Sequence, residues 1–178
     1  RVSVCIANYN GQHLLRDCLD SVLAQDIGPA VEIEIIVHDD ASSDGSLALL
    51  RTDYPQVKVI ASEQNVGFCI ANNRMAETAS GDYLLLLNND AALARDALSA
   101  LLAEQGRING PCILSLPQYD WETGVLVDRG CLLDPFYNPV PNLDPDRHEV
   151  AYVIGACLWI PRGLWHDLGG FPSAFGSI

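Results

Sequence analysis

The stretch Asp82-Tyr83-Leu84-Leu85-Leu86-Leu87-Asn88-Asn89-Asp90 decides the fold of this chain. Its uninterrupted leucines predict a strand that is buried on both faces, as in a parallel sheet. The strand ends abruptly in two amides and a carboxylate, a set of groups that suits a hard divalent cation. Because open α/β sheets bind ligands at the carboxyl ends of their strands, this junction is a candidate site. A simple Asn/Asp turn would have the same sequence.

Composition limits the classes of protein to consider. The chain has 178 residues, of which 49% are hydrophobic, and these values fit one domain with a substantial core. A net charge of −13 without a local basic patch disfavours nucleic acid as a partner. The six cysteines show no Cys-x-x-Cys spacing, so we predict free thiols in a reducing compartment. No apolar run has the ~20 residues of a membrane-spanning helix.

Strands and helices alternate in the first half of the chain. We predict strands at 2–7, 32–37, 57–61 and 83–87, and helices at 11–25, 44–51, 67–79 and 95–105. This alternation predicts the α/β class, with a Rossmann-like, mostly parallel sheet flanked by helices.

The second half breaks this alternation. Its residues 134–149 predict a long irregular loop, because four prolines interrupt regular pairing. A strand is expected again at 150–160, followed by a short helix that starts near Pro161. The chain opens directly on a strand and stops without a helix cap, so we expect it to be part of a longer protein.

Every predicted strand of the first half ends in polar residues. Because the carboxyl ends of parallel strands meet at one edge, these groups are expected to form a crevice for a nucleotide. The four groups are Asn8-Tyr9-Asn10, His38-Asp39-Asp40, Ser62-Glu63-Gln64-Asn65 and Asn88-Asn89-Asp90.

Three side chains near this edge have both a ligand-binding and a structural interpretation. The ring of Tyr9 offers a flat surface for a base, and it equally suits a lid over the sheet edge. Asp40 could accept a hydrogen bond from a pyrimidine N–H, although a turn or helix cap uses the same residue type. Asn73 is a poor helix former that reaches either into the crevice or into solvent.

Several common nucleotide and catalytic motifs are absent from the sequence. There is no Gly-x-Gly-x-x-Gly after the first strand, no P-loop, no Gly-x-Ser-x-Gly elbow and no zinc-ligand spacing. These absences disfavour a dinucleotide-binding fold, a P-loop nucleotidase and an α/β-hydrolase.

The order of the remaining motifs resembles the family 2 glycosyltransferases of GT-A fold. The resemblance covers nearly the whole chain, and the Asn-Asn-Asp form is similar to a bacterial, rhamnosyltransferase-like branch. The segments that carry it are Tyr9-Asn10, Asp39-Asp40-x-Ser42-x-Asp44-Gly45-Ser46, Glu63-x-Asn65-x-Gly67-Phe68, Gly81-Asp82-Tyr83, Asn88-Asn89-Asp90, Gly155-Ala156, Pro161-Arg162 and Gly169-Gly170-Phe171.

The resemblance implies one GT-A domain over 1–178, with a nucleotide-sugar-binding half at 1–106 and an acceptor-side half at 107–178. It implies transfer of a sugar, with inversion, from a nucleotide-diphosphate donor to a glycan or lipid-linked acceptor, assisted by Mn²⁺ or Mg²⁺. It places the metal at Asp90 and the donor or acceptor sugar near Gly155 and Ala156. The nucleotide-binding positions that it implies are Ala7, Tyr9, Asp40, Gly67, Asn73 and Asn89.

The catalytic base and the cellular setting follow from the same resemblance. The family's base is expected beyond Ile178, so no residue of this chain is assigned to that role. The family context implies a cytoplasmic location, with peripheral membrane association through parts outside this chain.

Two alternatives stay open at this point. Asn88 stands where many members carry Asp, so a non-catalytic module that binds nucleotide or glycan is one alternative. A nucleotidyltransferase is the other, but it needs a basic glycine-rich loop that Asn10-Gly11-Gln12 does not supply.

Overall fold

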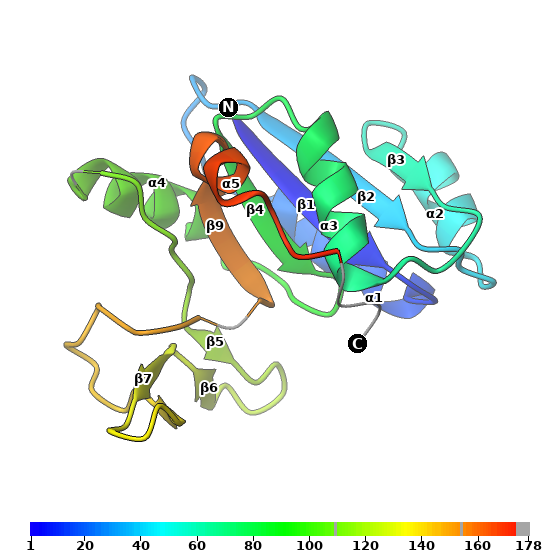
Figure 1. Ribbon diagram of the computed structural model, residues 1–178. Helices are drawn as coiled ribbons and strands as arrows, with labels where there is room; N and C mark the ends of the chain where they lie inside the picture. The colour runs from blue at the N-terminus through cyan, green and yellow to red at the C-terminus, as the bar shows by residue number, and fades with distance from the viewer. Residues whose placement is uncertain (109, 154, 174–178) are drawn as a thin grey trace.

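A five-stranded sheet forms the centre of the computed structural model, which describes residues 1–108, 110–153 and 155–173 (Figure 1). Its strand order is β3-β2-β1-β4-β9. The first four strands are parallel and β9 runs antiparallel beside β4. Their bounds are β1 Val2–Asn8, β2 Ile33–Asp39, β3 Lys58–Ala61, β4 Tyr83–Asn88 and β9 Cys157–Pro161. The predicted α/β class and mostly parallel sheet are confirmed.

The leucine run of β4 divides between two hydrophobic cores. Leu85 and Leu87 pack into the core on one face of the sheet, and Leu84 and Leu86 pack into the core on the other. Successive side chains of a strand point to opposite faces, so an uninterrupted apolar run is what a strand between two helical layers requires. The structure therefore confirms the predicted strand that is buried on both faces.

Helices cover both faces of the sheet. The helices α1 (Gln12–Leu23), α2 (Ser46–Asp53) and α4 (Ala97–Arg107) contribute to one core. The helices α3 (Gly67–Thr78) and α5 (Arg162–Leu168) contribute to the other core and face the viewer in Figure 1. The predicted ends of the first four strands and helices agree with the observed ends to within two residues. No helix in the described part of the chain has the length and hydropathy of a membrane span.

Two small hairpins lie in the second half, within residues 118–141. The first pairs β5 (Gln118–Tyr119) with β6 (Leu126–Asp128), and the second pairs β7 (Cys131–Leu133) with β8 (Pro139–Pro141). Regular pairing within 134–149 was not expected, and this expectation is wrong for β8. Both strands of a two-stranded ladder are edges, and edge positions tolerate the missing N–H of proline.

The predicted strand at 150–160 is wrong over its first half. The strand begins only at Cys157, while Tyr152 forms an isolated bridge to Cys131. Tyr152 therefore pairs with the second hairpin, whereas contact with β4 begins at Ala156, whose carbonyl accepts a hydrogen bond from the N–H of Asn88. The division of the domain at residue 106 stays a prediction, although β9 and α5 from the second half complete the main sheet and its cover.

Candidate functional site

The order in which strands are added to the sheet reverses between β1 and β4. From β1 the sheet grows through β2 to β3, whereas β4 and β9 lie on the other side of β1. Such a switch point leaves a crevice at the carboxyl ends of the two strands. Ala7 pairs with His38 on one side and with Asn88 on the other, so three of the predicted polar strand ends lie side by side.

The buried side chain of Asn8 connects these three strand ends. Its Nδ2 donates to Asp39 Oδ2 at 2.9 Å and to Ser42 Oγ at 3.3 Å. Its Oδ1 accepts a hydrogen bond of 2.9 Å from Asn89 Nδ2. A buried amide with all these partners is rigid, because breaking any bond leaves a polar group without water. This role of Asn8 was not predicted from the sequence, where its only signal is an amide at a strand end.

The loops after β1 and β2 hold each other in place. The backbone N–H of Asn10 donates to Ser42 Oγ at 2.9 Å, and that of Ser43 donates to Asn10 Oδ1 at 2.8 Å. Asn10 and Ala41 both adopt left-handed backbone conformations, with φ of 51° and 64°. Such conformations cost energy in residues other than glycine and persist where neighbouring bonds enforce them. Tyr9 stands on this braced loop with 54% of its surface exposed, so its ring is accessible to a ligand.

Asp40 is only 4% exposed and binds the start of α3. Its Oδ1 accepts from the N–H of Val66 and its Oδ2 from the N–H of Gly67, both at 2.8 Å. Gly67 has φ of 80°, a conformation that glycine adopts without strain. Asp40 thus holds the start of α3 and does not cap α2, the helix that follows it in sequence. Its contact with a base stays a prediction.

His38 lies buried behind Asp40. Its Nδ1 is 4.0 Å from Asp40 Oδ1, and burial lowers the pKa of this histidine. Removal from water disfavours the charged imidazolium, so His38 is neutral at neutral pH and adds no positive charge to the site.

The amide of Asn73 is used by a distant backbone segment. Its Nδ2 donates to the carbonyl of Phe171 at 2.8 Å, and its Oδ1 accepts from the Phe171 N–H at 2.9 Å. A Cβ on Gly170 would come within 2.6 Å of Asn73 Oδ1, so the close approach depends on glycine. Asn73 therefore fastens the chain after α5 to α3, and its contact with a nucleotide stays a prediction.

A cavity of about 810 Å³ opens beside the end of β4. Asn88 and Asp90 line it, together with Ala156 from the loop before β9. Ala156 also accepts a hydrogen bond of 2.9 Å from the Asn88 N–H, which fixes these two segments against each other. The structure thus brings the predicted metal position and one predicted sugar position to a single cavity.

The opposite wall of this cavity comes from the first hairpin. Gln118, Tyr119 and Trp121 line it, and Tyr119 and Trp121 are 62% and 79% exposed. The Nε2 of Gln118 is buried without a hydrogen-bond partner among the described residues. Exposed aromatic rings such as those of Tyr119 and Trp121 can stack on the faces of sugar rings.

Asp90 fits the role of a metal ligand contributed by the protein. It is exposed at the strand end, and its carboxylate is the anionic group beside the amides of Asn88 and Asn89. Among the described residues, no group of three or more His, Cys, Asp or Glu side chains is arranged so that it could hold a metal ion. Mg²⁺ and similar ions commonly bind through one or two carboxylates together with substrate phosphates. A single carboxylate therefore suffices when a diphosphate supplies the other oxygens.

Known glycosyltransferases are similar to this chain in sequence. A putative teichuronic acid biosynthesis glycosyltransferase of Bacillus subtilis, TuaG, is 29% identical over 163 residues, which are 89% of this chain and 60% of the relative. A poly(ribitol-phosphate) beta-glucosyltransferase of Bacillus spizizenii is 35% identical over 102 residues, or 55% of this chain and 16% of the relative. The chain thus spans 60% or less of the length of these two relatives.

Solved structures establish the same fold. S. aureus TarS 1–349 superposes with a TM-score of 0.75 at 22% identity, over 99% of this chain and 52% of that chain. The mannosyltransferase PcManGT from Pyrobaculum calidifontis, in complex with GDP-Man and Mn²⁺, superposes with a TM-score of 0.72 at 21% identity, over 97% and 48%. The predicted GT-A fold is confirmed. The sequence profile of glycosyl transferase family 2 matches residues 3–168, so this chain belongs to that family.

Proposed function

We propose that this chain is the donor-binding domain of a glycosyltransferase that moves a sugar from a nucleotide-diphosphate donor to a glycan or lipid-linked acceptor. The observation that carries the proposal is the shared cavity of Asp90, Asn88 and Ala156 at the carboxyl end of β4. Relatives support the donor class, because TarS has been solved with UDP-GlcNAc and PcManGT with GDP-Man. Relatives named for teichuronic acid and poly(ribitol-phosphate) support a polymeric glycan acceptor.

In this proposal the nucleotide lies across the ends of β1, β2 and β4. The exposed ring of Tyr9 stacks on the base, with the backbone of Ala7 beside it. Asp40 and Gly67 form the wall behind the base, and Asn89 contacts the ribose from its fixed position on Asn8. Asn73 supports the site indirectly, because its side chain donates a hydrogen bond to the backbone carbonyl of Phe171.

The diphosphate leads from this nucleotide site towards Asp90. Asp90 would hold a divalent ion, Mn²⁺ or Mg²⁺, which would supply the positive charge that stabilises the diphosphate as leaving group. Gly155 and Ala156 lie beside the transferred sugar, and the exposed rings of Tyr119 and Trp121 line the same cavity. The net charge of −13 makes neutralisation essential, because the surface itself repels a diphosphate.

The transfer is proposed to proceed with inversion. The acceptor oxygen forms a bond to the anomeric carbon from the face opposite the diphosphate, and the bond to the diphosphate breaks with its electron pair. The proton of the acceptor hydroxyl passes to a carboxylate base, which we place beyond Ile178.

The reaction is proposed to take place in a reducing compartment, the cytoplasm, with any membrane association arising from parts outside this chain. All six cysteines are free, and Cys5, Cys18, Cys131 and Cys157 are buried, which supports this placement.

Thermal unfolding with a panel of nucleotides tests the donor class. The panel contains UDP, dTDP and GDP with Mn²⁺, and Mn²⁺ alone and ADP with Mn²⁺ as controls. Binding to the folded state raises Tm, so we expect one pyrimidine or guanine nucleotide to raise Tm more than both controls. A Tm that stays at the control value with every nucleotide contradicts the proposal.

A further inference from the structure

A second cavity gathers the basic side chains of the segment between α4 and α5. It has a volume of about 330 Å³ and lies between α4 and the loops that follow β6 and β8. Residues 108–161 contain three Arg, Lys or His side chains, Arg129, Arg147 and His148, and all three line this cavity. The same stretch contains seven Asp and Glu residues, and none of them lines it. We call it the arginine–histidine pocket.

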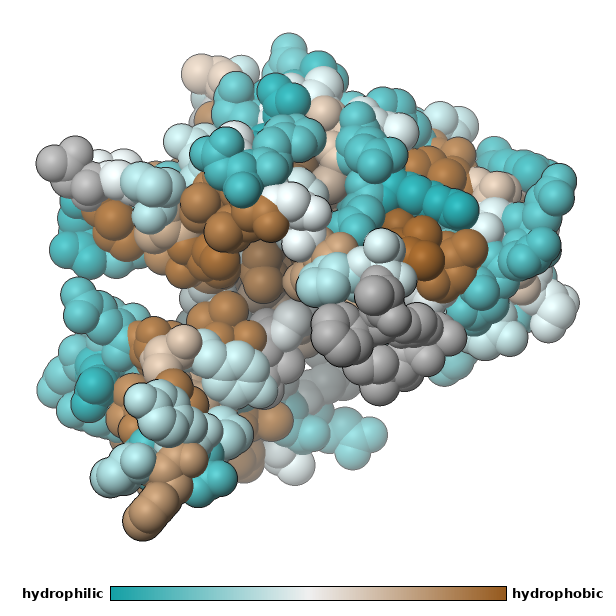
Figure 2. Space-filling view, in the orientation of Figure 1, coloured by the Kyte–Doolittle hydropathy of each residue, from teal (hydrophilic) through white to brown (hydrophobic). Residues whose placement is uncertain are grey.

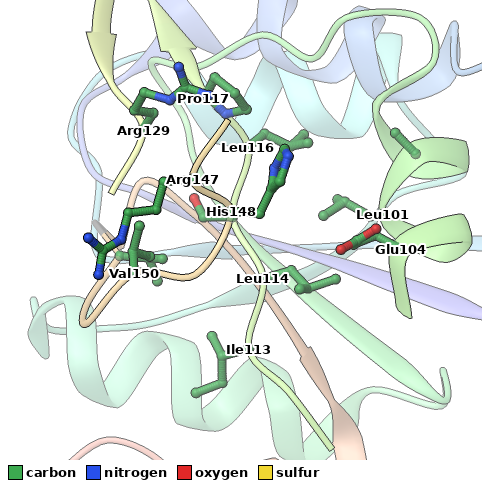
Figure 3. Close-up of a pocket in the computed structure, with 13 residues that line it drawn as sticks. Leu101, Glu104, Ile113, Leu114, Leu116, Pro117, Arg129, Arg147, His148 and Val150 are labelled. Atoms are coloured by element: carbon green, nitrogen blue, oxygen red, sulfur yellow. The ribbon is translucent and has the colours of Figure 1, made fainter. Parts of the chain in front are cut away.

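The pocket combines an apolar floor with a cationic rim. Leu101 from α4 and Leu114 and Leu116 from the following strand-like segment form the floor. Figure 3 shows Arg129 and His148 over this floor, while the guanidinium of Arg147 turns outward at the rim. Such a surface suits an amphiphilic ligand or a polymer segment that carries an anionic group.

The two arginines are positioned by backbone carbonyls and keep charge available for a ligand. The guanidinium of Arg129 donates to the carbonyl of Pro145 at 2.8 Å, and Nε of Arg147 donates to that of Glu149 at 3.3 Å. Neither arginine forms a salt bridge with a carboxylate of the described residues. Elsewhere in the chain Arg16 and Lys58 are each paired with a carboxylate.

Glu104 is the one acid that lines the pocket, and its charge is already compensated. Its carboxylate accepts two hydrogen bonds from Arg107, at 2.6 Å and 2.9 Å. The hydrogen bond from Arg107 holds the pKa of Glu104 below its ordinary value, and the charge of His148 adds to this effect. The Glu104–Arg107 pair therefore leaves the positive charge of the rim largely uncancelled.

The arginine–histidine pocket adjoins the cavity of Asp90. Ala100, Leu116 and Pro117 line both cavities. Figure 2 shows a hollow between the part of the surface that contains α4 and the lobe of the hairpins, with hydrophobic side chains on both sides of it. A ligand anchored at the rim can therefore extend along this hollow to the end of β4.

We propose that Arg129 and His148, with Arg147 at the rim, bind a phosphate group of the acceptor while the acceptor hydroxyl reaches the sugar beside Asp90. Phosphate binding by this pocket does not depend on the proposed function. The statement that the phosphate belongs to the acceptor does rest on it. Guanidinium groups bind phosphate through charge-assisted hydrogen bonds, and the phosphate belongs either to a phosphodiester polymer or to the diphosphate of a lipid-linked acceptor.

Calorimetric titration of the full chain, in EDTA and without donor, tests the pocket directly. The two phosphate probes are a glycerol-phosphate hexamer and farnesyl diphosphate, and maltohexaose is the uncharged control. We expect at least one phosphate probe to bind, more weakly at 200 mM than at 50 mM NaCl, while maltohexaose does not bind. The probe that binds identifies the source of the phosphate, and no binding of either probe overturns the inference.

Substitutions locate the binding. Arg129→Gln combined with His148→Gln is expected to weaken binding of the probe by about tenfold or more, since one charged guanidinium and one imidazole donor are lost. His148→Gln alone removes a side chain that is exposed, and it serves as the variant least able to disturb folding. Arg51→Gln, an exposed arginine on α2, is the matched control and leaves the affinity unchanged.

An affinity of both pocket variants equal to that of the unmodified chain also overturns the inference. The result is independent of the proposed function. Probe binding without any nucleotide binding supports phosphate binding by the pocket and contradicts the transferase proposal. Nucleotide binding without probe binding supports the transferase proposal and contradicts phosphate binding by the pocket.

Discussion

The two halves of this domain place their polar and apolar groups in opposite ways. In the parallel half, Asn8, Asp39 and Asp40 are almost fully buried. Asn8 donates a hydrogen bond to Asp39, and Asp40 accepts one from the start of α3. In the hairpin region, residues 118–149, Trp121 and Tyr137 are 79% and 83% exposed. The first half therefore builds a rigid edge before any ligand arrives. The hairpin region presents large side chains on short strands, where substitutions are expected to cost little in folding stability.

The largest contrast is expected between two tryptophans. Trp159 in β9 is fully buried, stacks on Tyr83 with ring centroids 4.8 Å apart, and donates from Nε1 to Gln105 Oε1 at 3.3 Å. Trp159→Ala is expected to lower the free energy of unfolding by about 3–5 kcal/mol, measured by urea denaturation. Trp121→Ala, the matched change in the hairpin region, is expected to stay within about 0.5 kcal/mol. Equal effects would mean that the two regions do not differ in packing.

A smaller contrast is expected between two aspartates. Asp40→Ala leaves the N–H groups of Val66 and Gly67 without their acceptors, at a cost of about 1–3 kcal/mol in unfolding free energy. Asp146→Ala removes an exposed carboxylate from the hairpin region and is expected to change stability by less than about 0.5 kcal/mol. Hydrogen exchange of the first turn of α3 should rise in the Asp40 variant. Unchanged exchange there would show that Asp40 does not hold this helix.

The smallest contrast concerns acid stability. Burial opposes ionisation of Glu34, but hydrogen bonds from Ser3, Ser80 and Lys58 outweigh it and lower the pKa of this carboxyl from 4.5 to about 2. A lowered pKa in the folded state stabilises the fold above pH 4.5, and this stabilisation is lost as the pH falls towards 2.

Glu34→Gln is therefore expected to flatten the fall in unfolding free energy between pH 5 and pH 2, by an amount on the order of 1 kcal/mol. Glu122→Gln, an exposed change in the hairpin region, should leave the pH curve as it is. Parallel curves for the Glu34 variant and the unmodified chain would refute this contribution.

The predictable part of the fold is the part whose signals are local. The composition of leucines 84–87 and of the β-branched strand 33–37 predicts that they are buried. The helical spacing of hydrophobic residues predicts which face of each neighbouring helix is buried. The hairpins are not predictable in this way, because strands of two or three exposed residues have no hydrophobic pattern. The start of β9 at Cys157 depends on where β4 ends, which is a tertiary relation.

The candidate site was predictable in place but not in detail. Polar strand ends on a parallel sheet meet at one edge by topology alone, and the structure places Asn8, His38 and Asn88 together. The partners of individual groups depend on contacts between distant segments. Asp40 meets residues 26 and 27 positions away, and Asn73 meets Phe171 at a separation of 98 positions. No local pattern encodes such pairs, and the arginine–histidine pocket is of the same kind.

Calorimetric titration of the nucleotide that gives the largest rise in Tm, in Mn²⁺, tests the central claim that Asp90 holds the metal and diphosphate of a sugar nucleotide. The unmodified chain is expected to bind this nucleotide only with Mn²⁺, and Asp90→Asn is expected to lose about tenfold or more in affinity. Asp96→Asn, which changes another carboxylate of the same cavity, is the matched control and should bind as the unmodified chain does. Mn²⁺-dependent binding that is equally strong in the Asp90 variant would contradict the account.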